Sequence, residues 1–125
     1  MSGLTLDAGA LIALDRGDRR VIVLLARGRE RKERVTVPAT VAAQAIRKPS
    51  VQARLVRLLR DPFTDLVPLD ASDATAVGIL LERTRTSDIA DAHLVLCARR
   101  ARQPIVTGDA KDLARLDPDA ILVAL

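Results

Sequence analysis

The segment formed by residues 86–113 constrains the fold more than any other part of the chain. It begins with polar and acidic residues, continues through an almost wholly apolar run at residues 89–98, and then reaches a short β-branched stretch at residues 104–107. The apolar run predicts a buried helix, and the β-branched stretch predicts a short buried strand. A helix that leads directly into such a strand is typical of an α/β protein, in which helices cover a parallel sheet.

Short strand-like segments alternate with helical segments along the whole chain. We expect strands at residues 3–6, 35–38, 65–69, 104–107 and 120–123, and helices at residues 8–14, 19–29, 39–46, 51–60, 71–83, 89–98 and 109–116. Ser50 is expected to cap the helix at residues 51–60, in which Leu55, Leu58 and Leu59 face inward. The alternation predicts a three-layer α/β/α architecture, with a parallel sheet and helices on both of its faces.

The composition limits the class of protein. A chain of 125 residues suffices for one domain with a real core and not for two, so residues 1–125 are expected to form one domain. The net charge of +4 comes mostly from Arg, which suits phosphate contact but equally describes an ordinary solvated surface. The single Cys97 lies in the apolar helix and is expected to act as a small hydrophobe. No signal peptide and no long apolar run is present, which predicts a cytoplasmic protein without a membrane partner.

Several common site signatures are absent from the sequence. The single His and single Cys argue against a zinc site, and the lack of GxxxxGK[ST] and GxGxxG argues against a nucleotide-binding loop. Phe63 is the only aromatic residue, so stacking of bases on aromatic rings is not expected. A receiver domain fits poorly, because no second acid follows Asp7 at a distance of two residues.

Carboxylates stand at the ends of the predicted elements. Asp7 follows the first strand, Asp109 follows the strand at residues 104–107, and Asp88 and Asp91 open the apolar helix. In an open α/β sheet, sites form at the carboxyl ends of the strands, so these acids are expected to converge. Burying the charge of Asp91 in an apolar helix costs free energy unless an opposite charge compensates it. Mg²⁺ can provide such a charge, because it prefers a few carboxylates plus waters as ligands. A divalent cation site is therefore one explanation of this pattern.

Helix capping is the other explanation of the same acids. An Asp at the N-cap with a second acid three residues later is a normal helix start. The D-x-x-D pattern occurs three times, at residues 70 and 73, 88 and 91, and 109 and 112. The local pattern alone does not separate a capping residue from a metal ligand.

Four stretches, taken in their order and spacing, make nearly the whole chain resemble the PIN-domain family. They are L-T-L-D-A-G-A-L-I-A-L near the start, V-P-A-T-V-A-A-Q, D-A-H-L-V-L-C-A and I-V-T-G-D-A-K-D-L. Within that family, the chain is most similar to the VapC-type ribonuclease toxins of bacterial toxin–antitoxin pairs. The resemblance implies a five-stranded parallel sheet in the order 3-2-1-4-5 and an endoribonuclease that hydrolyses RNA phosphodiester bonds with Mg²⁺ or Mn²⁺.

The resemblance also implies partners. A cognate VapB-like antitoxin would neutralise the protein, and the protein itself would form a homodimer. The helices at residues 39–46 and 51–60 resemble the surfaces used for these contacts, although they can equally serve only to cover the sheet. Basic residues around the cleft are expected to hold the RNA backbone, with Arg16, Arg47, Lys48 and Arg85 as candidates.

Matching the family motifs assigns catalytic and metal-binding roles to particular acids. The third strand would be an edge strand, so Asp70 and Asp73 are expected to be helix caps, and His93 is expected to be a satisfied core residue. Thr107 would support a carboxylate or a water, and Asp112 is either a further site residue or an ordinary residue of a helix start. The expected metal ligands are Asp7, Asp91, Asp109 and, one turn before Asp91, Asp88.

One position departs from the family pattern. The family usually carries a Glu on the helix after the second strand, and here Gln44 takes that place. An amide oxygen can bind a metal ion but brings no negative charge. This departure leaves open a second interpretation, in which the chain is a catalytically degraded PIN-fold module that binds RNA or a protein partner.

Overall fold

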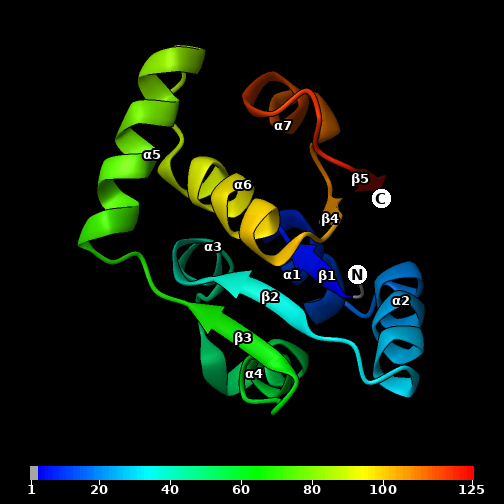
Figure 1. Ribbon diagram of the computed structural model, residues 1–125. Coiled ribbons are helices and arrows are strands. Elements are labelled where there is room, and N and C mark those ends of the chain that lie inside the picture. Colours follow the sequence, from blue (N-terminus) through cyan, green and yellow to red (C-terminus); the bar gives the residue numbers. More distant parts are fainter. Residues whose placement is uncertain (1–2) are drawn as a thin grey trace.

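The computed structural model describes residues 3–125, which form a five-stranded parallel sheet in the order β3-β2-β1-β4-β5 (Figure 1). The strands are β1 (Leu4–Leu6), β2 (Val35–Pro38), β3 (Thr64–Val67), β4 (Ile105–Thr107) and β5 (Leu122–Ala124). This order confirms the one that the resemblance implies, and it makes β3 an edge strand. It also places β1 and β4, which are far apart in the sequence, side by side at the centre of the sheet.

Helices cover both faces of the sheet, which confirms the three-layer prediction. They are α1 (Ala8–Asp15), α2 (Arg19–Glu30), α3 (Ala39–Ala45), α4 (Ala53–Leu59), α5 (Ala71–Thr84), α6 (Ile89–Ala101) and α7 (Ala110–Leu116). One group, α5 to α7, packs together on one side, with α6 lying along β1 and β2, and α1 packs against α2, α3 and α4 on the other (Figure 1). None of the helices in residues 3–125 is long and apolar enough to cross a bilayer.

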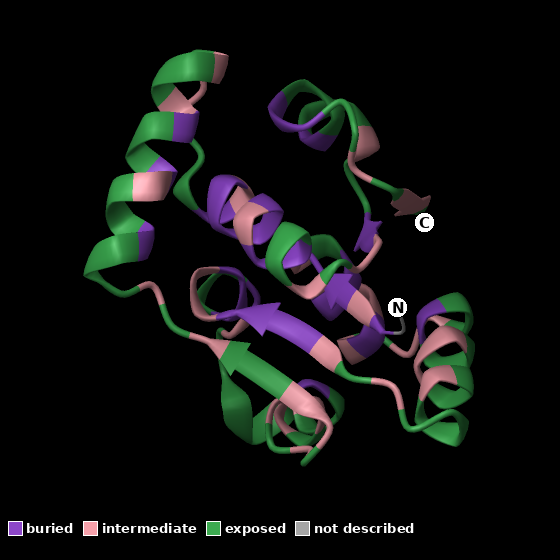
Figure 2. Cartoon of the chain, viewed as in Figure 1, coloured by how far each residue is buried: buried purple, intermediate pink, exposed green. Residues whose placement is uncertain are grey.

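The core lies between α6, α1 and the central strands. Leu6, Leu11, Leu94 and Val106 have no exposed surface. Figure 2 shows buried stretches along α6 and the central strands, whereas the outer side of α5 is exposed. The predicted apolar run of α6 is thus the central element of one layer. Cys97 lies on this helix, where burial raises the pKa of its thiol to about 11, as expected for an inert apolar cysteine.

The connection between α3 and α4 differs from the prediction. Ser50 does not cap α4, because it lies in a short 3₁₀ turn (Pro49–Val51) and α4 begins only at Ala53. Gln52 explains the later start. Its side-chain oxygen accepts hydrogen bonds from the backbone N–H groups of Arg47 and Lys48 at 2.8 and 3.0 Å. Its side-chain nitrogen donates to the carbonyl of Ala45 at 3.0 Å, so one amide satisfies the end of α3 and fixes the turn.

Asp70 and Asp73 were both predicted to cap α5, and the prediction is correct for Asp70 and wrong for Asp73. Asp70 caps the helix, because its carboxylate accepts the N–H of Asp73 at 2.8 Å. The side chain of Asp73 has a different role from capping: it is buried and accepts a hydrogen bond from Arg100 of α6 at 2.5 Å, which holds the pKa of Asp73 below its usual value. The prediction failed because the face of α5 that meets α6 is set by long-range packing, which the D-x-x-D pattern does not report.

His93 is a core residue, as predicted, but only one of its ring nitrogens has a partner. The side chain is fully buried, and Nδ1 lies 2.8 Å from the hydroxyl of Thr40 on α3. Nε2 faces Asp73 at 3.7 Å and forms no hydrogen bond within residues 3–125. Burial lowers the pKa of His93, so the ring is neutral at physiological pH and joins α3, α5 and α6 in the core.

Candidate active site

The central pair of strands brings two predicted site residues to the same edge of the sheet. Leu6 of β1 pairs with Val106 of β4, and both strands run in the same direction. Asp7 directly follows β1, and its N–H donates to the carbonyl of Val106 at 3.1 Å. Asp109 follows β4 after one glycine, so the two carboxylates stand at the carboxyl ends of neighbouring parallel strands.

The carboxylate of Asp7 joins the two strand ends. It is buried, one oxygen accepts the N–H of Ala10 at 2.7 Å, and the other accepts the N–H of Gly108 at 3.2 Å. The first bond caps α1, and the second holds the turn that carries Asp109. A single side chain therefore fixes the position of the first site residue and of the loop that carries another.

Gly9 allows this close approach, and sequence reasoning missed it. A Cβ on Gly9 would lie 3.3 Å from the Asp7 carboxylate and 3.4 Å from the backbone of Gly108. The first turn of α1 thus packs directly on the backbone at the end of β4. The D-A-G sequence contains the signal, because a glycine two residues after the acid permits backbone-to-backbone contact.

Gly9→Ala is expected to lower any activity of this site at least several-fold without a comparable loss of stability. An added Cβ inside α1 favours the helix by roughly 1 kcal/mol, but it presses on the Asp7 carboxylate and on Gly108. Thermal unfolding measures the stability, and an assay of the nuclease activity that the family resemblance implies measures the other effect. Gly78→Ala in α5 is the control, because a Cβ there meets nothing within 4 Å. Equal activity of both variants would contradict the importance of this contact.

The start of α6 carries the second pair of acids. Asp88 caps the helix by accepting the N–H of Asp91 at 2.9 Å, so the predicted capping role holds for Asp88. The Asp91 side chain is half-buried in the first turn. Its burial, followed by the charges of Asp88, Asp7 and Asp109, raises the pKa of Asp91 to about 6. The charges of the other three predicted acids thus act on Asp91, in addition to its burial.

The segment after β4 adds a fifth acid, Asp112, in the first turn of α7. The buried hydroxyl of Thr107 accepts the N–H of Asp109 at 2.7 Å, so Thr107 fixes the backbone of that residue. The Asp109 side chain makes no capping bond to α7. Its interaction with the Asp112 side chain is the main cause that raises the pKa of Asp112. Asp112 thus belongs to the acidic group, although its position in the first turn of α7 is also that of an ordinary helix-start residue.

A cleft of about 310 Å³ opens between the α5–α6 connection, the start of α6 and α7. In Figure 1, α5 and α7 stand on either side of this end of α6. Arg115 was not among the predicted RNA contacts, and of the four candidates only Arg85 lines the cleft. The lining residues are Arg85, Thr86, Ser87, Asp88, Asp91, Asp112, Arg115 and Leu116.

The acidic group fits a hard divalent cation in chemistry and charge. All of its donors are carboxylate oxygens, the type that Mg²⁺ prefers, and burial, followed by the charges of the neighbouring acids, raises the pKa of Asp91. Within residues 3–125, no three acidic, His or Cys side chains are close enough to bind one ion together in this conformation. Gln44 is exposed, and no hydrogen bond of its side chain is found among the described residues. Binding an ion would therefore require the carboxylates to move closer together.

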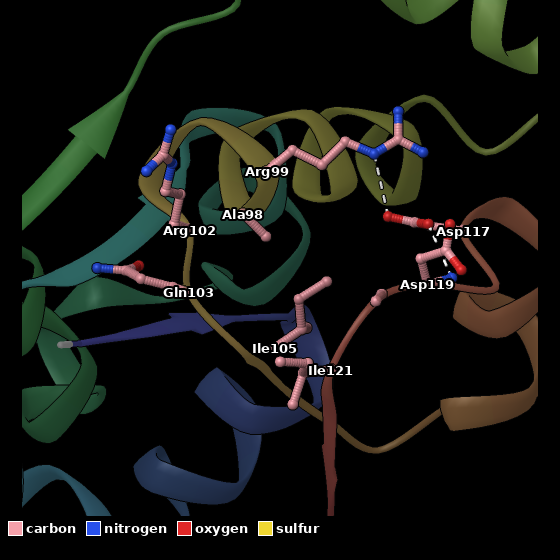
Figure 3. Close-up of a pocket in the computed structure, with 9 residues that line it drawn as sticks. Ala98, Arg99, Arg102, Gln103, Ile105, Asp117, Asp119 and Ile121 are labelled. Carbon is pink, nitrogen blue, oxygen red and sulfur yellow. Dashed lines mark hydrogen bonds and ion pairs between the residues drawn. The ribbon is translucent and has the colours of Figure 1, made fainter. Parts of the chain in front are cut away.

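A second cleft, of about 240 Å³, lies away from the acidic group. Figure 3 shows it between the end of α6 and the turn before β5, with Ile105 and Ile121 side by side. Arg99 donates to the carboxylate of Asp117 at 3.0 Å and so joins α6 to that turn. The residues that sequence analysis selected for chemistry do not line this cleft.

Comparison with known proteins finds a matching family model and several similar solved structures. The family model described as the PIN domain matches residues 4–118. A search of curated proteins finds no match. VapBC2 from Rickettsia felis, solved bound to a DNA fragment from the promoter, has a TM-score of 0.66 at 16% identity and covers 98% of each chain.

Two further solved structures are similar to this chain. FitAB bound to an IR36 DNA fragment has a TM-score of 0.63 at 14% identity, covering 97% of this chain and 94% of the other. FitAcB from Neisseria gonorrhoeae has a TM-score of 0.59 at 16% identity and covers 95% of each chain. At these identities, the structural similarity bears on the fold alone.

Proposed function

Because the chain belongs to the PIN-domain family, we propose that it is a metal-dependent endoribonuclease of the VapC type. PIN domains are usually nucleases and generally bind divalent metals. The observation that carries the proposal is the position of Asp7 and Asp109 at the carboxyl ends of β1 and β4, near the start of α6. There, the burial of Asp91 and the charges of the neighbouring acids raise the pKa of Asp91 to about 6. Such uncompensated carboxylates are typical of a site that functions with a bound cation.

The residues of this chain would act by holding oxygen donors in place. When bound, Mg²⁺ or Mn²⁺ supplies positive charge to the phosphate oxygens and acidifies a water. Asp7 is fixed for this role by two backbone N–H groups, and Thr107 fixes the backbone of Asp109. Asp88 and Asp91 approach from the start of α6, with Asp112 as a supporting residue. The expected products of RNA hydrolysis carry a 5′-phosphate and a 3′-hydroxyl.

A calorimetric titration with Mn²⁺, made beside an RNA cleavage assay, tests this function. We expect saturable binding, cleavage that EDTA abolishes, and 5′-phosphate ends on the products. The protein must first be freed of any copurifying partner, since a partner over the cleft would mask the site. An absence of Mn²⁺ binding at millimolar concentrations, together with intact RNA, would contradict the proposal.

The alternative function is a degraded PIN-fold module that binds RNA or protein. The observations that favour it are the amide at Gln44, exposed on α3, and the separation of the carboxylates in the described conformation. This alternative predicts RNA or protein binding that is indifferent to EDTA, with no cleavage under any metal. The same two assays therefore separate the two functions.

The proposal includes a cognate VapB-like antitoxin and a homodimer. A groove of about 260 Å³ between α2 and α4 supports a contact with a protein partner, because most of its exposed lining is apolar. Ile22, which is 37% exposed, contributes to that lining. Sedimentation of the protein with and without its antitoxin tests both contacts, and a chain that stays monomeric and unbound at micromolar concentrations would contradict them.

A further inference from the structure

Two arginines line the acidic cleft from different walls. Arg85 directly follows α5, and Arg115 lies in the last turn of α7. Both residues are exposed. Within residues 3–125, neither guanidinium forms an ion pair or a hydrogen bond, although three carboxylates share the cleft with them. The arginines that do form ion pairs are Arg20, Arg29, Arg31, Arg34, Arg99 and Arg100.

The carboxylates of this cleft oppose the binding of a nucleic acid. The carboxylates of Asp88, Asp91 and Asp112 repel a polyanion, and a cation bound by the acidic group offsets only part of that charge. Guanidinium groups on the rim can attract the phosphates that flank the reacting one. Arg suits this role because its planar fork matches two phosphate oxygens.

We propose that Arg85 and Arg115 form a phosphate clamp, which holds the sugar–phosphate backbone of an RNA strand across the acidic cleft. The inference rests on the proposed nuclease function and names the residues that position its substrate. The cleft has no aromatic side chain, and Phe63, the only aromatic residue, lies elsewhere, within 5.9 Å of the guanidinium groups of Arg29 and Arg34. The clamp therefore binds the backbone of the strand and does not distinguish its bases by stacking.

The backbone of Arg85 provides a clean test of this role. Its φ of 54° and ψ of 45° lie in the left-handed region, which favours glycine at the end of a helix. Arg85→Gly removes the guanidinium while relieving this strain, so the variant is expected to be at least as stable as the natural chain. Arg102 has the same left-handed conformation after α6, with a φ of 54° and a ψ of 49°, and it lines the second cleft (Figure 3). Arg102→Gly is thus a control with equal charge and equal backbone relief.

The experiment compares Arg85→Gly with Arg102→Gly, and Arg115→Ala with Lys111→Ala of the same helix. Steady-state cleavage of a single-stranded RNA with Mn²⁺ gives KM and kcat, and a labelled RNA in EDTA gives the salt dependence of binding. We expect each clamp variant to raise KM by roughly 10-fold or more, as for removal of a hydrogen bond to a charged group. The slope of log K against log salt should fall by about 0.7 for each phosphate that the variant no longer binds. Neither control should change KM by more than about 2-fold.

The outcomes separate the clamp from the nuclease function. Cleavage that persists with the same KM and the same salt slope in Arg85→Gly and Arg115→Ala would overturn the clamp and leave the nuclease intact. An absence of cleavage in every form, combined with RNA binding that weakens only in the two clamp variants, would support the clamp and overturn the nuclease. Equal losses in the clamp variants and their controls would show a general charge effect and would also overturn the clamp.

Discussion

Replacing Asp7 by Asn is expected to reduce metal-dependent RNA cleavage by about 1000-fold while the fold is kept. The variant removes one negative charge from the acidic group, and charge stabilisation by a metal site is worth several kcal/mol, which corresponds to a factor of this size. Asn caps helices as well as Asp does, so the bond from Ala10 survives. The oxygen that accepts the N–H of Gly108 becomes an NH2 group, which cannot accept, so this bond is lost at a cost of about 1–3 kcal/mol in the free energy of unfolding. Cleavage rates and thermal unfolding measure both effects.

Asp70→Asn is the matched control for this variant. Asp70 caps α5 with a φ of −84° and a ψ of −178°, and Asp7 caps α1 with a φ of −85° and a ψ of 177°. The two acids thus share residue type and cap geometry, but Asp70 follows the edge strand β3 and lies outside the acidic group. Cleavage should be unchanged in Asp70→Asn. Full activity in Asp7→Asn would show that its carboxylate is structural and would remove it from the proposed site.

The second large effect is expected from Asp91→Asn, which should stabilise the metal-free protein at neutral pH. The pKa of Asp91 is raised from 3.8 to about 6 on folding, so ionisation of Asp91 favours the unfolded chain. Stability from this group is fully present below pH 3.8 and is lost as the pH rises through 6. A shift of this size in a half-buried group, reduced for solvent screening, corresponds to roughly 1–2 kcal/mol above pH 7. The melting temperature in EDTA should therefore rise by roughly 3–8 °C.

Melting at low pH and melting with added Mn²⁺ are the two controls for this prediction. At pH 4, where Asp91 is mostly protonated in the folded protein, the natural chain and Asp91→Asn should melt at nearly the same temperature. Addition of Mn²⁺ at neutral pH should stabilise the natural chain by mass action and leave the variant nearly unchanged. A variant that melts below the natural chain in EDTA at pH 7.5 would show that the Asp91 carboxylate makes favourable contacts, contrary to the repulsion among the acids.

The sequence alone allowed correct predictions for features that depend on local patterns, such as the type of each element and the residue that follows it. The alternation of short strands and helices predicted the α/β class, because the spacing of apolar residues and the β-branched stretches can be read from the local sequence. Asp7 and Asp109 were expected to meet because each follows a strand, and the carboxyl ends of parallel strands share one edge. The order of the strands came from the resemblance to a family, since local patterns do not state which strands are neighbours.

Features that depend on contacts between distant elements were missed. The burial of Asp73 follows from the packing of α5 on α6, and the role of Gly9 follows from the approach of two backbones across the sheet. Arg115 joins the cleft only because α7 stands opposite the α5–α6 connection. An exposed arginine on a short helix has no distinguishing sequence signal. The metal ligands and the partners remain predictions, which metal titration, RNA cleavage and sedimentation test.

The pairing of β1 with β4 also determines when the site can form during synthesis. The N–H of Gly108, which binds the Asp7 carboxylate, is made about a hundred residues after Asp7. At ribosomal rates of about 5–20 residues per second, the first half of the site waits roughly 5–20 s for the second. A nascent or truncated chain that ends before β4 lacks both the neighbouring strand and Asp109. If the proposed nuclease function holds, the chain is expected to be inactive towards its own messenger until β4 and Asp109 have been made.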